Sequence, residues 1–246
     1  MFVDIYVFCV ILFSNFLQTT TGFGYAIVAT PLLALVLPAK ESVMLTMLTA
    51  LITRLAMLKL VSGAGSFRDI SPLLFTGLIG SAVGAYTLAA INEYWLKIFI
   101  AIILLFTAWG LWKERRIEIK HPKRIERLVG ACSGFLGSTT SINGPPIIMY
   151  YLNAGMAEDK ALFRGHLTRY FLVMNIIGVI LAFGFGTMQV GSLWKFVLYS
   201  LPALFFGLYF GEKLFQRINA QAFKRMTLLM VVCSAVLILA NAANVK

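Results

Sequence analysis

Acidic side chains are scarce in this sequence, and the charge that it does carry is mostly basic. Only 13% of its 246 residues are charged, with 10 Asp and Glu against 21 Lys and Arg. None of the acidic residues lies in the middle of a long apolar run, so the sequence offers no carboxylate proton relay and no acidic cation site. A P-loop and an HExxH motif are also absent, which argues against a built-in nucleotide-binding or catalytic zinc site. We therefore expect no catalytic residue, no metal and no cofactor, and a protein that is not an enzyme.

Cysteine is scarce as well. The three cysteines, Cys9, Cys132 and Cys233, lie in apolar runs without the spacing of a metal site. We interpret them as small buried apolar residues. The alternative is a redox or sulfur-handling role for Cys9 or Cys132, which would make the protein a membrane enzyme or a sulfur-relay component.

Apolar residues, in contrast, make up 60% of the chain. A soluble core of this size could not hide so much apolar surface, and most of the apolar runs are long enough for a span of about 20 residues. The runs lie near residues 3–37, 43–61, 72–91, 95–112, 128–157, 167–186, 193–211 and 226–243. We expect an all-α polytopic membrane protein, multi-pass in the cell inner (plasma) membrane. The net charge of +11 then reflects basic cytoplasmic loops rather than nucleic-acid binding.

The chain contains an internal repeat. An offset of 115 residues aligns Gly22 with Gly137 and Thr53-Arg54 with Thr168-Arg169. A later offset of 127 pairs two GxxxG motifs, Gly80/Gly84 and Gly207/Gly211, which allow helices to approach closely. We predict two halves of four apolar segments each: an N-terminal transmembrane repeat (1–112), a charged cytoplasmic linker (113–127) and a C-terminal transmembrane repeat (128–246).

The basic residues predict how the halves are oriented. If the first segment of each half is a broken, re-entrant helix that enters and leaves on one side, the halves are inverted. Fifteen Lys and Arg then lie inside, with Arg54 and Arg169 set aside. Only Lys40, Lys97, Lys195 and Lys246 lie outside. Eight full crossings, the alternative, give a weaker bias, so the positive-inside rule favours six crossings plus two hairpins.

The first segment of each half is interrupted by polar and backbone-exposing residues. The interruptions are "TTTGFG" (Thr19–Gly24) and "GSTTSINGPP" (Gly137–Pro146). We expect two half-helices to meet at an unwound tip, as in transporters that bind solutes near the bilayer midplane. The start of a half-helix has orphaned N–H groups and a positive dipole end, which suit an anion. Asn143 or Gly144 can cap a helix that begins at Pro145, and Thr30 or Thr21 can do the same before Pro31 or Gly22.

Two arginines lie in or near apolar runs, Arg54 in "LITRLAML" and Arg169 in "GHLTRYFLV". An arginine in a span costs a few kcal/mol, and its planar guanidinium fits oxyanions. The alternative is that each arginine snorkels to the interface or pairs with helix-end carbonyls. His166 could add a donor or titrate, although a lone histidine is more often structural.

These features define the candidate substrate-binding residues. They are Thr19, Thr20, Thr21, Gly22, Gly24, Thr30, Pro31, Arg54, Gly137, Ser138, Thr139, Thr140, Asn143, Gly144, Pro145 and Arg169.

The segments "GFGYAIVATPLLALVLP" (Gly22–Pro38) and "GSTTSINGPPIIMYYL" (Gly137–Leu152) resemble the sulfite exporter TauE/SafE family, also called the four-toluene-sulfonate uptake permeases. The resemblance covers nearly the whole chain. It implies a permease that moves small sulfur-containing anions, such as sulfite, thiosulfate or organosulfonates, across the bacterial inner membrane. The sequence departs from the family at Phe23 and Tyr25, where more glycine is common.

We expect a secondary transporter that works by alternating access around a midplane site. The rival hypotheses are an anion channel and a transporter of another small organic anion. The expected partners are a small anionic substrate and the lipid bilayer, and not nucleic acid. The sequence leaves open which anion is moved, its direction, a coupling ion (proton or sodium) and a homodimer.

Overall fold

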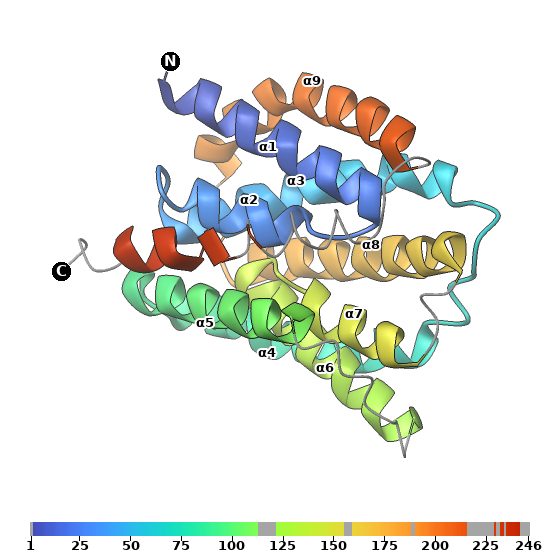
Figure 1. Ribbon diagram of the computed structural model, residues 1–246. Helices are drawn as coiled ribbons and strands as arrows, with labels where there is room; N and C mark the ends of the chain where they lie inside the picture. The colour runs from blue at the N-terminus through green and yellow to red at the C-terminus, as the bar shows by residue number, and fades with distance from the viewer. Residues whose placement is uncertain are drawn as a thin grey trace.

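The computed structural model describes residues 2–112, 122–154, 159–187, 190–215, 229, 232–233 and 235–241. Within these ranges the chain forms the nine α-helices α1–α9, a further helical stretch at residues 235–241, and no strand (Figure 1). The helices are α1 (Phe2–Thr21), α2 (Tyr25–Leu33), α3 (Ala39–Leu60), α4 (Ser71–Ala90), α5 (Glu93–Trp112), α6 (Pro122–Thr140), α7 (Gly144–Asn153), α8 (Lys160–Gly184) and α9 (Val190–Phe215). The all-α prediction is confirmed.

Six of these helices are long and apolar enough to cross a membrane: α1, α3, α4, α5, α8 and α9. Large apolar side chains cover the outside of the bundle, among them Phe75, Trp95, Phe106 and Phe205, each more than half exposed. Such a surface needs lipid around it, because a soluble protein exposes only small apolar patches. The chain is a multi-pass membrane protein.

The cysteines correct one expectation. Cys9, Cys132 and Cys233 are exposed on the bundle surface and are not buried. An apolar run in a membrane protein supplies both the core and the lipid-facing side of a helix, so a residue in such a run can lie on either face.

Two predicted boundaries also differ from the structure. Helix α6 begins at Pro122, inside the predicted linker. Its first turns carry several charged residues, so α6 is less apolar than the six helices that can cross a membrane. Residues 113–121, the rest of that linker, and most of the predicted run 226–243 lie outside the described residues, although 235–241 are helical.

Both interrupted segments fold back on themselves. The Tyr6 hydroxyl in α1 donates to the Leu32 carbonyl near the end of α2 at 3.1 Å, so α2 returns along α1 after the break at residues 22–24. Helix α7 likewise returns beside α6 after the break at residues 141–143 (Figure 1). The arms are unequal, which corrects the expectation of two half-helices: α1 has 20 residues and α2 has nine.

Each long arm lies against the GxxxG motif of the other predicted half. Gly80 and Gly84 of α4 face α6, and a Cβ on Gly80 would lie 2.0 Å from the Ala131 carbonyl oxygen. Gly207 and Gly211 of α9 face α1 in the same way, and a Cβ on either glycine would lie 2.9 Å from a carbonyl oxygen of α1. Both motifs therefore pack helices inside the chain, since only glycine permits such close approach.

Hydrogen bonds give the direction of these helix pairs. The Asn15 side chain donates to the Leu204 carbonyl, and Thr20 Oγ lies 3.3 Å from the Gly211 carbonyl oxygen, so α1 and α9 are parallel. Helices α4 and α6 are parallel as well, because Ser81 Oγ bonds the Gly134 carbonyl and Thr139 Oγ lies 3.1 Å from the Gly84 carbonyl oxygen. The long arm of each hairpin thus contacts the same element of the opposite half.

The central helices α3 and α8 run antiparallel. A Cβ on Gly178 in α8 would lie 3.5 Å from Met47 Sδ in the first half of α3. Gly165, near the start of α8, instead contacts Ala64, just beyond the end of α3. These two helices carry the intramembrane arginines, so their crossing sets the position of the candidate site.

A carboxylate fixes the start of α3. Glu93, at the first residue of α5, accepts hydrogen bonds from the backbone N–H groups of Ala39 and Lys40 at 2.6 and 3.2 Å. These groups are among those that a helix start leaves unpaired, and a negative charge there complements the helix dipole. Glu93 therefore caps α3 from a neighbouring helix, where Pro38 at the N-cap makes no side-chain bond.

The close contact of α4 with α6 gives a testable prediction. A Cβ on Gly134 of α6 would lie 2.0 Å from the Gly77 carbonyl oxygen, and backbone cannot move aside as a side chain can. We expect Gly134→Ala to lower the stability of the purified protein by about 1–3 kcal/mol, as overpacking does. Thermal unfolding in detergent measures it.

The matched control is Gly191→Ala in α9, where no described atom lies within 4 Å of the added Cβ. It should leave the melting temperature unchanged or raise it, because alanine favours a helix over glycine. Equal melting temperatures for the two variants would refute the close packing of α4 on α6.

Candidate functional site

The first break is made by glycine. Gly22 and Gly24 have φ of 85° and 97°, a left-handed conformation that glycine adopts without strain. Helix α1 ends here with a bond from the Gly22 N–H to the Gln18 carbonyl at 2.7 Å. Helix α2 begins directly after Gly24. The break therefore comes from the two glycines, and the threonines before it remain helical.

Helix α2 corrects the expected role of Thr30. Pro31 lies inside α2 and not at its start, so Thr30 does not cap a helix that begins at Pro31. Thr21 does not cap α2 either. Its hydroxyl lies 2.9 Å from the Leu17 carbonyl oxygen and 2.6 Å from that of Phe23, and it accepts from the Phe23 N–H.

Most of the expected hydroxyl donors are used by the backbone. Thr20, Thr139 and Thr140 donate to the carbonyl four residues earlier in their own helix, at 2.7 to 2.8 Å. This is a common bond for threonine inside a helix, and it leaves these hydroxyls no proton for a ligand. Thr19 and Ser138 are buried, and their hydroxyls have no hydrogen-bond partner among the described residues.

The second break keeps unpaired polar groups at the start of a helix. Ser141 has a φ of 64°, and Asn143 is the N-cap of α7, which begins with Gly144 and Pro145. The helix begins one residue before the predicted start at Pro145, with Asn143, one of the two predicted caps, at the N-cap. The Asn143 side chain, however, makes no capping bond. The Asn143 Nδ2 and Ser141 Oγ atoms are buried and have no partner within the described ranges. Gly137 allows this reversal, because a Cβ there would lie 2.8 Å from the Asn143 Cβ.

Arg169 of α8 binds the turn that follows α3. Its guanidinium donates to the carbonyls of Val61, Ser62 and Ala64, and to Gly165 of its own helix. Nη1 and Nη2 are both occupied in this way. The sequence left open a pairing with helix-end carbonyls, and the structure has this arrangement. With these bonds in place, Arg169 does not present Nη1 or Nη2 to an anion.

His166 fastens the same loop from the neighbouring turn of α8. Its Nε2 lies 3.3 Å from Oδ2 of Asp69, which also accepts from the Ser66 N–H at 2.8 Å. The Ser66 bonds hold the pKa of Asp69 below its usual value, with a smaller contribution from His166. His166 and Arg169 together therefore anchor the α3–α4 loop.

Arg54 of α3 has a different environment. It is 3% exposed, and its Nη2 donates to the Oε1 of Gln18 in α1 at 3.1 Å. Its guanidinium carbon lies 4.6 Å from the ring centroid of Phe171 in α8, a cation–π distance. Nε and Nη1 have no hydrogen-bond partner among the described residues, and no described carboxylate forms an ion pair with Arg54. Arg54 is thus a buried cation with unused donors.

Phe171 links Arg54 to the second break. A Cβ on Gly144, the first residue of α7, would lie 3.9 Å from Cζ of Phe171 and 3.9 Å from Cδ1 of Ile27. One aromatic ring thus contacts both the guanidinium and the start of α7. Arg54 and the start of α7 thus share Phe171 as a neighbour, whereas Arg169 lies at the α3–α4 loop.

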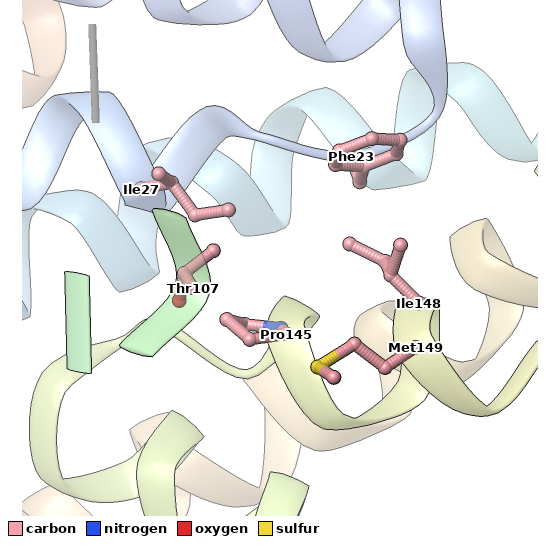
Figure 2. A pocket seen from close by; sticks show the side chains of 6 residues that line it. All are labelled: Phe23, Ile27, Thr107, Pro145, Ile148 and Met149. Atoms are coloured by element: carbon pink, nitrogen blue, oxygen red, sulfur yellow. The ribbon is translucent and has the colours of Figure 1, made fainter. Parts of the chain in front are cut away.

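An apolar pocket lies beside the start of α7 (Figure 2). It is lined by Phe23 and Ile27 from the first hairpin, Thr107 from α5, and Pro145, Ile148 and Met149 from α7. The Thr107 hydroxyl donates to the Ile103 carbonyl at 2.7 Å, so it is occupied. The lining of the pocket is apolar and offers no charged group to an anion.

A family model described as sulfite exporter TauE/SafE matches residues 7–238, nearly the whole chain. The chain belongs to the TauE/SafE family. TauE/SafE proteins are membrane transporters of sulfur-containing anions and not enzymes, so a small anionic substrate and the bilayer are the partners. No curated protein and no solved structure matches the chain.

Sequence reasoning missed Gln18 and Phe171, the two side chains that hold Arg54. Gln18 is 1% exposed and Phe171 also 1%. Gln18 carried a signal, because an amide in the apolar run before "TTTGFG" needs a partner when it is buried. Phe171 carried none, since one phenylalanine among 20 in a membrane chain predicts no contact.

We expect replacement of Arg169 and replacement of Arg54 to have different effects on the stability of the protein. Arg169→Met removes the partner of four carbonyls, of which those of Val61 and Gly165 are buried, and we expect it to destabilise the protein by roughly 2–4 kcal/mol. Arg54→Met removes a buried charge with unused donors and can keep the contact with Phe171, so the melting temperature should stay the same or rise. Thermal unfolding of both variants checks this, and a stable Arg169→Met beside an unstable Arg54→Met would contradict it.

Proposed function

We propose that the protein is a secondary transporter of small sulfur-containing anions, such as sulfite, thiosulfate or organosulfonates, across the bacterial inner membrane. One observation carries the proposal: Arg54 is buried in a transmembrane helix with Nε and Nη1 unpaired among the described residues. An unmatched charge at this depth is costly and is retained where function needs it. Family membership agrees with the sign of the charge.

The proposed anion site centres on Arg54 and the start of α7. Guanidinium stays charged at any physiological pH and offers planar N–H donors to oxygen atoms. The Asn143 side chain and the first N–H groups of α7 add donors and the positive end of a helix dipole. We no longer include Arg169, whose terminal nitrogens hold the α3–α4 loop, and we assign Gly22, Gly24 and Gly137 to the bends.

We propose further that the two halves are inverted repeats and that transport follows alternating access. The parallel pairs α1–α9 and α4–α6 are related by exchange of the halves, which supports the repeat. The antiparallel equivalents α3 and α8 favour a pseudo-twofold axis in the membrane plane over one along its normal. Hairpins that rock around a fixed site are the usual motion of such transporters.

Transport by Arg54→Ala tests the proposed function. In proteoliposomes with the purified protein, uptake of the best substrate from a panel of sulfite, thiosulfate, sulfate, sulfoacetate and ethanesulfonate should fall at least tenfold. Arg54→Lys should keep part of the activity, because it retains the charge without the planar donors.

Arg68→Ala is the control, since Arg68 is an exposed basic residue of the α3–α4 loop and should transport normally. Counterflow of labelled substrate separates a transporter from an anion channel, which has no alternating step. Normal uptake by Arg54→Ala would exclude the proposed anion site.

A further inference from the structure

Gln18 is the one described polar side chain that hydrogen-bonds to Arg54. Its Oε1 accepts from Nη2 of Arg54 at 3.1 Å, and its Nε2 lies 3.8 Å from Sδ of Met57, one turn further along α3. Because a guanidinium only donates, the amide oxygen must face Arg54, which fixes the amide orientation. The weak contact with the Met57 sulfur orients the Nε2 group of the same amide. Gln18 is therefore placed with a single orientation between two residues of α3.

Three elements surround the guanidinium and leave part of it without a hydrogen bond. Gln18 of α1 occupies Nη2, and Phe171 of α8 covers one face. Tyr25 of α2 is the titratable group that interacts electrostatically with Arg54, and its hydroxyl has no hydrogen-bond partner in the described ranges. Nε and Nη1, which carry three of the five N–H bonds of a guanidinium, remain unpaired among the described residues.

Gln18 also belongs to the tip of the first hairpin. Its backbone carbonyl accepts from the Gly22 N–H at 2.7 Å, the bond that ends α1. A movement of the bend at Gly22 and Gly24 thus moves the residue that holds Arg54. The side chain bonds the cation and the backbone ends the helix, so one residue joins the bend to the charge.

We propose that Gln18 is a positioning residue for anion transport: a neutral acceptor that orients Arg54 so that Nε and Nη1 face the substrate, and that couples this orientation to the first hairpin. The inference rests on the proposed function. It requires an acceptor that is neutral, because a carboxylate at this place would pair with Arg54 and compete with the substrate anion.

Gln18→Glu tests the inference, because its shape matches glutamine and it adds a negative charge. The carboxylate should pair with Arg54, and the pairing keeps it ionised at neutral pH. Anion affinity should then fall at least tenfold, while the melting temperature of the substrate-free protein should stay the same or rise, because the buried cation gains a partner. The probes are ethanesulfonate, thiosulfate and sulfate, and affinity is measured by thermal stabilisation and by the KM of uptake.

Gln18→Met serves as the matched control, since it keeps length without an acceptor. It should raise KM by a smaller factor than Gln18→Glu, since it adds no charge that competes with the anion. A merely structural Gln18 predicts that the affinity loss in each variant follows its loss of melting temperature.

Two results would overturn the inference: wild-type affinity in Gln18→Glu, or an affinity loss in Gln18→Glu that is no larger than that in Gln18→Met. Either result leaves the proposed function standing if Arg54→Ala still abolishes transport. Normal transport by Arg54→Ala, in contrast, removes the proposed function itself and this inference with it.

Discussion

A buried positive charge without a carboxylate partner among the described residues constrains the rest of this structure. Arg54 is 3% exposed and has Gln18 and Phe171 as neighbours, but no carboxylate partner in the described part of the chain. Burying an unpaired ion costs several kcal/mol, so the helices around Arg54 must be held together by other contacts. The glycine-mediated packing of α4 on α6 and of α1 on α9 supplies these contacts. The unpaired charge therefore destabilises the site, and close helix packing elsewhere in the bundle offsets that cost.

The two arginines illustrate how similar sequence contexts lead to different roles. Arg54 and Arg169 both follow a threonine in an apolar run and lie 115 residues apart. The breaks at 22–24 and 141–143 are instead 119 residues apart. The difference of four residues is about one helical turn, so the arginines occupy different levels relative to their hairpins. Arg169 reaches the carbonyls after α3, whereas Arg54 reaches Gln18.

The sequence predicted the helices, the two breaks and the start of α7 well, because length, hydropathy, glycine and proline act locally. It did not predict that Thr20, Thr139 and Thr140 donate to their own helices, or that Pro31 lies inside α2, because both depend on where the helix ends. The contact of Phe171 with Arg54 is tertiary and has no signal in one sequence. The sequence thus predicted that both arginines lie in membrane helices, but not which groups each guanidinium contacts.

The account rests on an anion bound at Arg54, and an experimental structure of the protein with a transported sulfonate or thiosulfate tests this most directly. We predict substrate oxygens within hydrogen-bond distance of Arg54 Nε and Nη1, beside Phe171 and the first residues of α7, with Gln18 still bonded to Nη2. An anion bound instead by Arg169 or by surface lysines, with the Arg54 side chain unchanged and unpaired, would contradict the account.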